Sequence, residues 1–148
     1  MAQMKKSQTQ KLADVMTKDV KAVSRSASLR DVACVMKERQ IGDVVVTDDD
    51  GKLYGIVTDR DLVVRGAAEG LDLDRTVVGE ICSQQDVVTL TPDASVDEAV
   101  QLMRERAIRR IPVVKDGAPV GIVSIGDLAQ LRDPASALGQ ISSAPPTP

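Results

Sequence analysis

The sequence predicts a mixed α/β (α+β) protein made of two copies of one small unit. An internal repeat is the first reason: SLRDVACVMKERQI at 28–41 aligns with SVDEAVQLMRERAI at 95–108, and GIVTDRDL at 55–62 aligns with GIVSIGDL at 121–128. The second reason is that each copy alternates helical periodicity with short apolar runs typical of buried strands. At 148 residues the chain is long enough for one domain, or for two small units that share a core.

Each copy is predicted to begin with a helix that a serine caps. Ser28 precedes Asp31, and Ser95 precedes Glu98, at the spacing of a capping box. The apolar residues that follow recur at helical spacing and define one face in each copy: Leu29, Val32, Ala33 and Met36, then Val96, Ala99, Val100 and Met103. We therefore expect both methionines to lie in the core.

Two strands and a closing helix are expected to complete each copy. The strands are predicted at 44–47 and 53–58 in the first copy, and at 111–114 and 119–124 in the second. Asp and Gly mark the turn between them, and Asp48-Asp49-Asp50 is read as such a turn rather than as a cation site. The closing helices are predicted at 59–68 and 125–132. A short helical segment (LADVMT or VGEICS) and a short strand (20–23 or 87–90) precede each copy.

These elements divide the chain into five parts. We predict a flexible N-terminus at 1–10, a first repeat at 11–70, a linker at 71–76, a second repeat at 77–132 and a Pro/Ser-rich tail at 133–148. Both ends are expected to pack poorly, with docking on a partner subunit as the alternative for the tail.

Composition argues against several classes of function. The chain has no histidine, the commonest general base and metal ligand, and neither Cys34 nor Cys82 has a metal-type spacing. A net charge of −3 argues against a nucleic-acid partner held by bulk charge. No signal peptide and no apolar run of membrane length is recognisable, so we expect a soluble cytoplasmic protein without catalytic activity, metal or required cofactor.

The repeated motif GIVTDRDL (55–62) and GIVSIGDL (121–128), called the doubled phrase below, contains in each copy a hydroxyl residue and, three residues later, an aspartate. Thr58 with Asp61, and Ser124 with Asp127, are capping boxes at a strand-to-helix junction, which is a purely structural role. A helix start is also suited to phosphate, and a carboxylate one turn inside it can accept hydrogen bonds from a ribose diol. A single such pair is a weak signal. Two at matching positions favour a nucleotide site.

The order helix, strand, turn, strand ending in G-I-V-[TS]-x-x-D-L, repeated after 66 residues, resembles a tandem pair of CBS (cystathionine β-synthase) domains. The resemblance covers roughly residues 12–132 and is closest to small stand-alone bacterial CBS-pair proteins. It implies two units packed about a pseudo-twofold axis. It also implies clefts between the units that bind AMP, ADP, ATP, S-adenosylmethionine or dinucleotides.

The resemblance implies two composite sites. The first comprises Thr58, Asp61, Ile41, Gly42, Asp43 and Val44, closed by Val87 and Val88. The second comprises Ser124, Asp127, Ile108, Arg109, Arg110, Ile111 and Pro112, closed by Thr17, Val20 and Ala22. Asp43 would repel a phosphate, so the second is expected to be the better anion site, with Arg109 or Arg110 as a phosphate ligand. Because the resemblance implies clefts that face each other, the choice of cleft that these arginines serve stays open. A solvated face or a salt bridge is the alternative for the arginine pair, and Arg60 is expected to be a surface residue.

The function implied is a regulatory module that senses energy or stress state through an adenosine nucleotide, which is a ligand rather than a cofactor. The alternative is a ligand-independent dimerisation or protein-interaction module with degenerate clefts. In either case we expect a homodimer and an effector protein that the sequence does not name.

Overall fold

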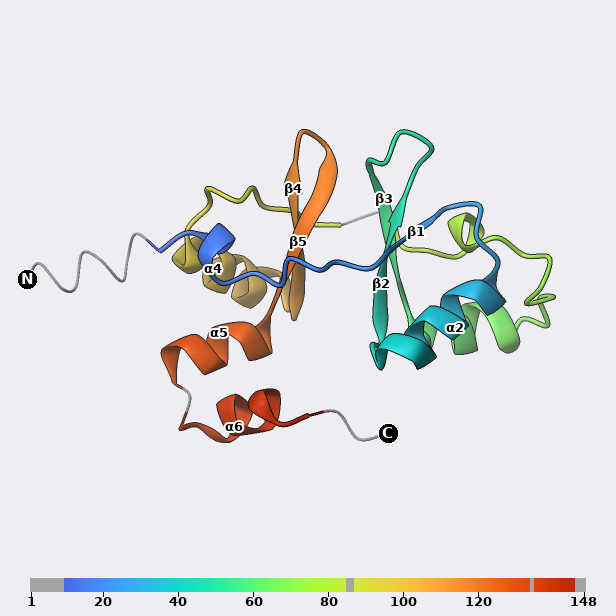
Figure 1. Ribbon diagram of the computed structural model, residues 1–148. Helices are drawn as coiled ribbons and strands as arrows, with labels where there is room; N and C mark the ends of the chain where they lie inside the picture. The colour runs from blue at the N-terminus through green and yellow to red at the C-terminus, as the bar shows by residue number, and fades with distance from the viewer. Residues whose placement is uncertain (1–9, 85–86, 134, 146–148) are drawn as a thin grey trace, which may run out of the picture. The chain divides into compact units, whose positions relative to one another are not determined.

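The computed structural model describes residues 10–84, 87–133 and 135–145, which form two compact units (Figure 1). The first unit consists of Lys21–Val87, and the second combines the chain up to Val20 with the chain from Val88 onward. In the described residues, no helix is long and apolar enough to cross a membrane.

The first unit is a three-stranded sheet with one long helix. Its strands β1 (Ala22–Ser24), β2 (Asp43–Thr47) and β3 (Leu53–Thr58) lie in the order β1-β2-β3, with β1 parallel and β3 antiparallel to β2. Helix α2 (Leu29–Arg39) joins β1 to β2. The closing segment, predicted as one helix over 59–68, is instead the short α3 (Asp59–Asp61) followed by a π-helix, η2 (Leu62–Ala67). The 3-10 turn η3 (Val78–Glu80) ends the unit's helical content.

The second unit repeats this plan. The strands β4 (Arg110–Lys115) and β5 (Ala118–Ser124) form an antiparallel hairpin, preceded by α4 (Val96–Arg106) and followed by α5 (Ile125–Arg132). Leu90 bridges Val113 in parallel, where β1 pairs with β2 in the first unit. The unit also contains the 3-10 turn η1 (Leu12–Asp14) and a last helix, α6 (Ala137–Ser143).

The leading segment of each sequence repeat folds with the other repeat. Leu12 of η1 opens the first repeat, yet its N–H donates to the carbonyl of Ala94 at 2.9 Å and its side chain is buried in the core of the second unit. Val78 of η3 opens the second repeat, yet its N–H donates to the carbonyl of Ala27 at 2.8 Å and its side chain is buried in the first core. Each compact unit therefore combines most of one repeat with the beginning of the other.

Two glycines make room for these leading segments. Gly55 and Gly121 begin the two G-I-V phrases. A Cβ on Gly55 would lie 2.5 Å from the backbone oxygen of Ser83, and one on Gly121 would overlap the side chain of Met16. Glycine leaves room in both copies where another segment passes beside the strand, and the contact is less adaptable at Gly55, where the neighbouring atom belongs to the backbone.

Serine caps begin both long helices, as predicted. The Ser28 hydroxyl accepts a hydrogen bond from the Asp31 N–H at 3.0 Å, and Ser95 forms a reciprocal capping box with Glu98. Both helices have 11 residues, and both end at a left-handed residue, Gln40 or Ala107, with φ of 54° in each case. The two copies therefore share even the left-handed backbone conformation of the residue that ends the helix.

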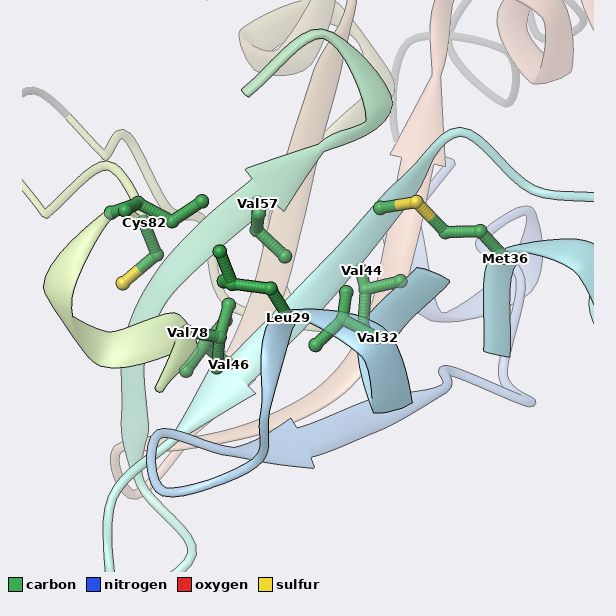
Figure 2. Packing of buried hydrophobic residues seen from close by; sticks show 9 residues of the cluster. Leu29, Val32, Met36, Val44, Val46, Val57, Val78 and Cys82 are labelled. Atoms are coloured by element: carbon green, nitrogen blue, oxygen red, sulfur yellow. The ribbon is translucent and has the colours of Figure 1, made fainter. Parts of the chain in front are cut away.

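The two cores are aliphatic. In the first unit, side chains from α2, β2, β3 and η3 converge between the helix and the sheet (Figure 2). With Ile81 and Cys82, which follow η3, the core consists of Leu29, Val32, Met36, Val44, Val46, Val57, Val78, Ile81 and Cys82. The second core consists of Leu12, Val96, Ala99, Met103, Ile111, Val113, Val123 and Leu128. The prediction that both methionines are core residues is confirmed. Their flexible side chains suit cores built without Phe or Trp.

The turn read from Asp48-Asp49-Asp50 is also confirmed. Asp48 accepts hydrogen bonds at 2.9 Å from the N–H groups of Asp50 and Lys52, and Gly51 supplies the positive φ of 79° that the turn requires. The carboxylate of Asp48 therefore stabilises the hairpin.

The prediction of a poorly packed tail is wrong for residues 137–143. Ser136 caps α6 by accepting a hydrogen bond from the Gly139 N–H at 3.0 Å, and the helix packs along α5 (Figure 1). The segment is too short and too weakly periodic to predict a helix, so the packing partner determines it. The predicted flexible N-terminus lies outside the described residues except for Gln10.

Candidate functional site

The strand-to-helix junction at β5–α5 holds Ser124 and Asp127 in a reciprocal capping box. The Asp127 N–H donates to the Ser124 hydroxyl at 3.1 Å, and the Ser124 N–H donates to Asp127 Oδ2 at 2.9 Å. Both side chains are half-buried. The box uses the hydroxyl oxygen and one carboxylate oxygen. It leaves the hydroxyl proton and Oδ1 of Asp127 outside the box.

Thr58 and Asp61 form the same box at β3–α3. The two hydrogen bonds have the same lengths, 3.1 Å to the Thr58 hydroxyl and 2.9 Å to Asp61 Oδ2. The structural role of the doubled phrase is therefore confirmed in both copies. It is compatible with ligand binding because each box keeps a donor and an acceptor free of its own two bonds.

The residues predicted from the preceding strand lie directly beside each junction. Arg110 is the register partner of Ser124, and the carbonyl of Arg109 accepts the N–H of Ile125 at 2.8 Å. In the first unit Asp43 is the register partner of Thr58, and the carbonyl of Gly42 accepts the N–H of Asp59 at 2.9 Å. The two junctions share a backbone arrangement and differ in the charge they present.

A pocket of about 350 Å³ opens at the start of α5. The residues that line it come from β4, β5, α5 and α6: Arg109, Arg110, Ser124, Ile125, Gly126, Asp127, Gln130, Leu138 and Ser142. Both arginines are exposed, so the pocket carries two cations beside the polar groups of the capping box. The sequence predicts that four of these residues lie together: Arg109, Arg110, Ser124 and Asp127. It does not predict the pocket residues of α6, because this helix lies beyond the repeat.

In the first unit an acidic side chain lies at the matching position. Asp59 stands where the second unit has Ile125, and its carboxylate oxygens would be 3.1 and 3.6 Å from a Cβ on Gly42. Its Oδ1 accepts the N–H of Arg60 at 2.9 Å, while Arg60 itself is exposed, as predicted. The Asp59 carboxylate therefore takes up part of the space at this junction and gives it a negative charge.

A second polar pocket, of about 410 Å³, lies in the first unit and is lined by Arg65, Cys82, Ser83 and Gln84. Arg65 Nη1 donates to the carbonyl of Ile81 at 2.8 Å. Burial raises the pKa of the Cys82 thiol, and the negative charge of Asp61 raises it further. Cys82 is thus held as a neutral thiol.

The leading segment of each repeat pairs with the strand that ends at a capping box, β5 in the second unit and β3 in the first. Thr17 pairs with Ile122, two residues before Ser124, through N–H to carbonyl bonds of 2.9 and 3.0 Å. Ser83 pairs with Ile56, two residues before Thr58, through bonds of 2.9 and 3.1 Å. Thr17 was among the predicted residues and Ser83 was not. Aligning LADVMT with VGEICS would have revealed it, because Ser83 falls opposite Thr17.

The other residues predicted to line or close the two sites differ in how buried they are and in which unit they belong to. Val44 and Ile111 are 1% and 0% exposed and Pro112 is also buried, so Val44 and Ile111 direct their side chains into the cores. The half-buried residues are Ile41 and Val87 in the first unit and Ile108 and Val20 in the second. Ala22 belongs to the first unit and Val88 to the second, so each is in a different unit from the junction it was predicted to close.

The fold and its paired junctions define a duplicated α+β module, and comparison with known proteins identifies the family. The family model described as "CBS domain" matches residues 12–67 and again 78–133. The chain therefore belongs to the CBS-domain family and carries a pair of these domains. Proteins that consist of such a pair are typically regulatory modules.

Several relatives match most of this chain. Hypoxic response protein 1 of Mycobacterium tuberculosis is 35% identical over 117 residues, covering 79% of this chain and 81% of the relative. CBS domain-containing protein YhcV of Bacillus subtilis is 40% identical over 116 residues, covering 78% and 81%. The hexameric CBS-CP12 protein from bloom-forming cyanobacteria has a TM-score of 0.71 at 30% identity, over 86% of this chain and 74% of that one.

One solved relative is described with metal. The crystal structure of Hypoxic Response Protein I with two coordinated zinc ions has a TM-score of 0.74 at 34% identity, covering 81% of this chain and 97% of that one. Within residues 10–84, 87–133 and 135–145 of the present chain, no three His, Cys, Asp or Glu side chains gather in a group that could hold a metal ion.

Proposed function

We propose that this protein is a regulatory module that binds an adenosine nucleotide at the Ser124–Asp127 junction and catalyses no reaction. The observation that supports the proposal is the pocket at the start of α5, where two arginines, a capped helix start and a half-buried carboxylate line one space. In this arrangement Arg109, Arg110 and the helix start bind phosphate. Oδ1 of Asp127 accepts a hydrogen bond from the ribose.

The edge formed by Thr17 supports the nucleoside end of the ligand. Thr17 lies beside Ile122 on the strand that leads to Ser124, and Ile108 and Val20 are half-buried apolar residues of the same unit. With one tyrosine and no Phe or Trp in the chain, the adenine packs against aliphatic side chains rather than stacking on an aromatic ring. AMP, ADP and ATP share every group that these residues meet.

Charge makes this junction the stronger of the two nucleotide sites. The Thr58–Asp61 junction has Gly42 and Asp43 where the other has Arg109 and Arg110, and Asp59 where the other has Ile125. A phosphate placed there would meet carboxylates instead of guanidinium groups. Two like charges about 4 Å apart repel by a few kcal/mol near a protein surface.

In this proposal another protein, the effector, recognises whether the nucleotide is bound. The relative named as a hypoxic response protein suggests that the nucleotide reports energy or stress state. We propose a homodimer that presents the nucleotide-bound form to an effector, and the hexameric CBS-CP12 relative supports the association of such chains.

Thermal unfolding and titration calorimetry with AMP, ADP, ATP, NAD and S-adenosylmethionine test the proposal. Ligand at about 100 times its Kd adds about 2.7 kcal/mol to the free energy of unfolding, which raises Tm by roughly 5–10 °C for a chain of this size. Asp127→Ala removes the shift, and Asp61→Ala is the matched control in the weaker site. If no adenosine compound raises Tm, or if the variant that combines Asp61→Ala with Asp127→Ala keeps the full shift in Tm, the protein is not a nucleotide sensor.

A ligand-independent interaction module is the second candidate, and Asp59 favours it. Its carboxylate fills part of one junction, as expected for a site that no longer holds an anion. The mass of the purified protein in solution, measured with and without each nucleotide, distinguishes the two. A dimer that is indifferent to nucleotide, together with an unchanged Tm, favours this second function.

A further inference from the structure

The last helix, α6, has no counterpart in the first unit. It lies at Ala137–Ser143, after the second family match ends at residue 133, and it packs along α5 (Figure 1). Among the described residues, its capping bond and its side-chain hydrogen bonds join it to residues within 133–144. Its contact with the rest of the second unit is made by packing on α5.

Packing brings Ser142 of α6 to the first turn of α5. A Cβ built on Gly126 would lie 2.6 Å from the Ser142 hydroxyl oxygen and 3.6 Å from that of Ser124. The two hydroxyls thus flank the first turn of α5 near the same point. Ser142 is half-buried and lines the pocket that Arg109 and Arg110 also line.

Gly126 permits this approach because it has no side chain. At 2.6 Å from a Cβ, the Ser142 oxygen would overlap any larger residue at this position. Leu138, one turn earlier on α6, lines both this polar pocket and the neighbouring apolar groove between α4 and α5. Helix α6 therefore forms one wall of the pocket without filling it, and a volume of about 350 Å³ remains open.

We propose that Ser142 is a ligand-binding residue of the second unit and that α6 encloses the phosphate end of the nucleotide. The inference rests on the proposed function, since it assigns a further residue to the same site. The Ser142 hydroxyl donates to a phosphate oxygen beside the donors of α5 and the two arginines. Enclosure by α6 removes water from these charge-assisted hydrogen bonds and so strengthens them.

The test is titration calorimetry of three full-length chains with AMP and with adenosine: the wild type, Ser142→Ala and Ser143→Ala. Ser143 is the matched control because its hydroxyl donates to the carbonyl of Gln140 at 2.9 Å and its side chain is exposed. Ser142→Ala raises Kd for AMP about 3- to 10-fold and leaves Kd for adenosine unchanged, since the lost donor meets only phosphate. Ser143→Ala binds both compounds like the wild type.

Each other outcome overturns a different statement. Equal loss of AMP and adenosine in Ser142→Ala shows a role in packing and overturns the inference, as does an unchanged or tighter Kd for AMP. In both cases the proposed function stands, because the wild type binds. If the wild type binds neither compound, the proposed function fails and the inference fails with it.

Discussion

The carboxylate of Asp59 lies against the α-carbon of Gly42, with one oxygen 3.1 Å from the point that a Cβ there would occupy. In the other copy of this junction the residue after the cap is Ile125, and the backbone at the matching strand position belongs to Arg109. One junction thus presents a negative charge and the other presents positive charges. This difference makes the two sites separable by substitution.

Replacing Asp59 by isoleucine should create a second AMP site. Asp59→Ile removes the carboxylate and reproduces the residue of the other junction. At AMP concentrations far above those that saturate the Ser124–Asp127 site, the stoichiometry measured by calorimetry is expected to rise from one AMP to two per chain. The start of α3 then no longer carries the charge of Asp59, while Asp43 keeps the new site weaker than the other. The reciprocal Ile125→Asp should weaken the existing site about 10-fold or more. A stoichiometry that stays at one in Asp59→Ile would show that Asp59 is not what closes the first site.

Replacing either aspartate of the capping boxes should cost stability, but only one replacement should cost binding. Asp127→Ala and Asp61→Ala each remove a bond of 2.9 Å to the cap residue's N–H. Each is expected to lower the free energy of unfolding by about 0.5–2 kcal/mol, measured in urea without ligand. Only Asp127→Ala should also abolish the AMP-induced rise in Tm. If both variants lose binding equally, the charge asymmetry between the junctions does not govern the site.

The glycines of the G-I-V phrase should tolerate alanine unequally. A Cβ on Gly55 meets the backbone oxygen of Ser83 at 2.5 Å, and that oxygen is held by its bond to the Ile56 N–H. A Cβ on Gly121 meets the side chain of Met16, which can move to another rotamer. Gly55→Ala is expected to cost about 2–3 kcal/mol in urea unfolding and Gly121→Ala about 1 kcal/mol or less. Equal costs would mean that the two leading segments pack with the same freedom.

The sequence predicts those features that local patterns encode. Ser28, Ser95, Thr58 and Ser124 all cap helices where the spacing of Asp or Glu indicates, because a capping box needs only four consecutive residues. The strands and their turn follow in the same way from short-range alternation and turn chemistry. The bond between Arg109 and Ile125 follows from register, since hairpin pairing fixes which residues adjoin the junction.

Features that depend on tertiary packing could not be predicted. The leading segment of each repeat folds with the other repeat because Leu12 and Val78 are each buried in the core of the other repeat. Ser142 reaches the pocket because α6 packs on α5, a contact between segments whose sequences carry no matching signal. The strands at 44–47 and 111–114 were predicted to be buried, and Val44 and Ile111 are buried, but a family motif does not show that these two side chains point into the cores rather than into a cleft.

The buried thiol gives the first unit a predictable response to alkaline pH. Burial raises the pKa of Cys82 above its ordinary value of 9.0, so the folded chain retains the thiol proton more tightly than the unfolded chain. The resulting stabilisation is complete below the unfolded pKa near 9.0 and is lost as the pH rises through the higher folded pKa. Urea unfolding followed between pH 8 and 11 should show a decline in stability that is shallower in Cys82→Ala.

Thiol labelling provides an independent measurement of the same burial. Cys34 is exposed on α2, whereas Cys82 is buried in the first core. A thiol-specific reagent at pH 8 should label Cys34 in the native chain within seconds to minutes and Cys82 only as fast as the first unit opens. Cys34→Ser serves as the control, because it leaves only the slow phase. Rapid labelling of Cys82 in that variant would contradict the burial of Cys82 in the first core.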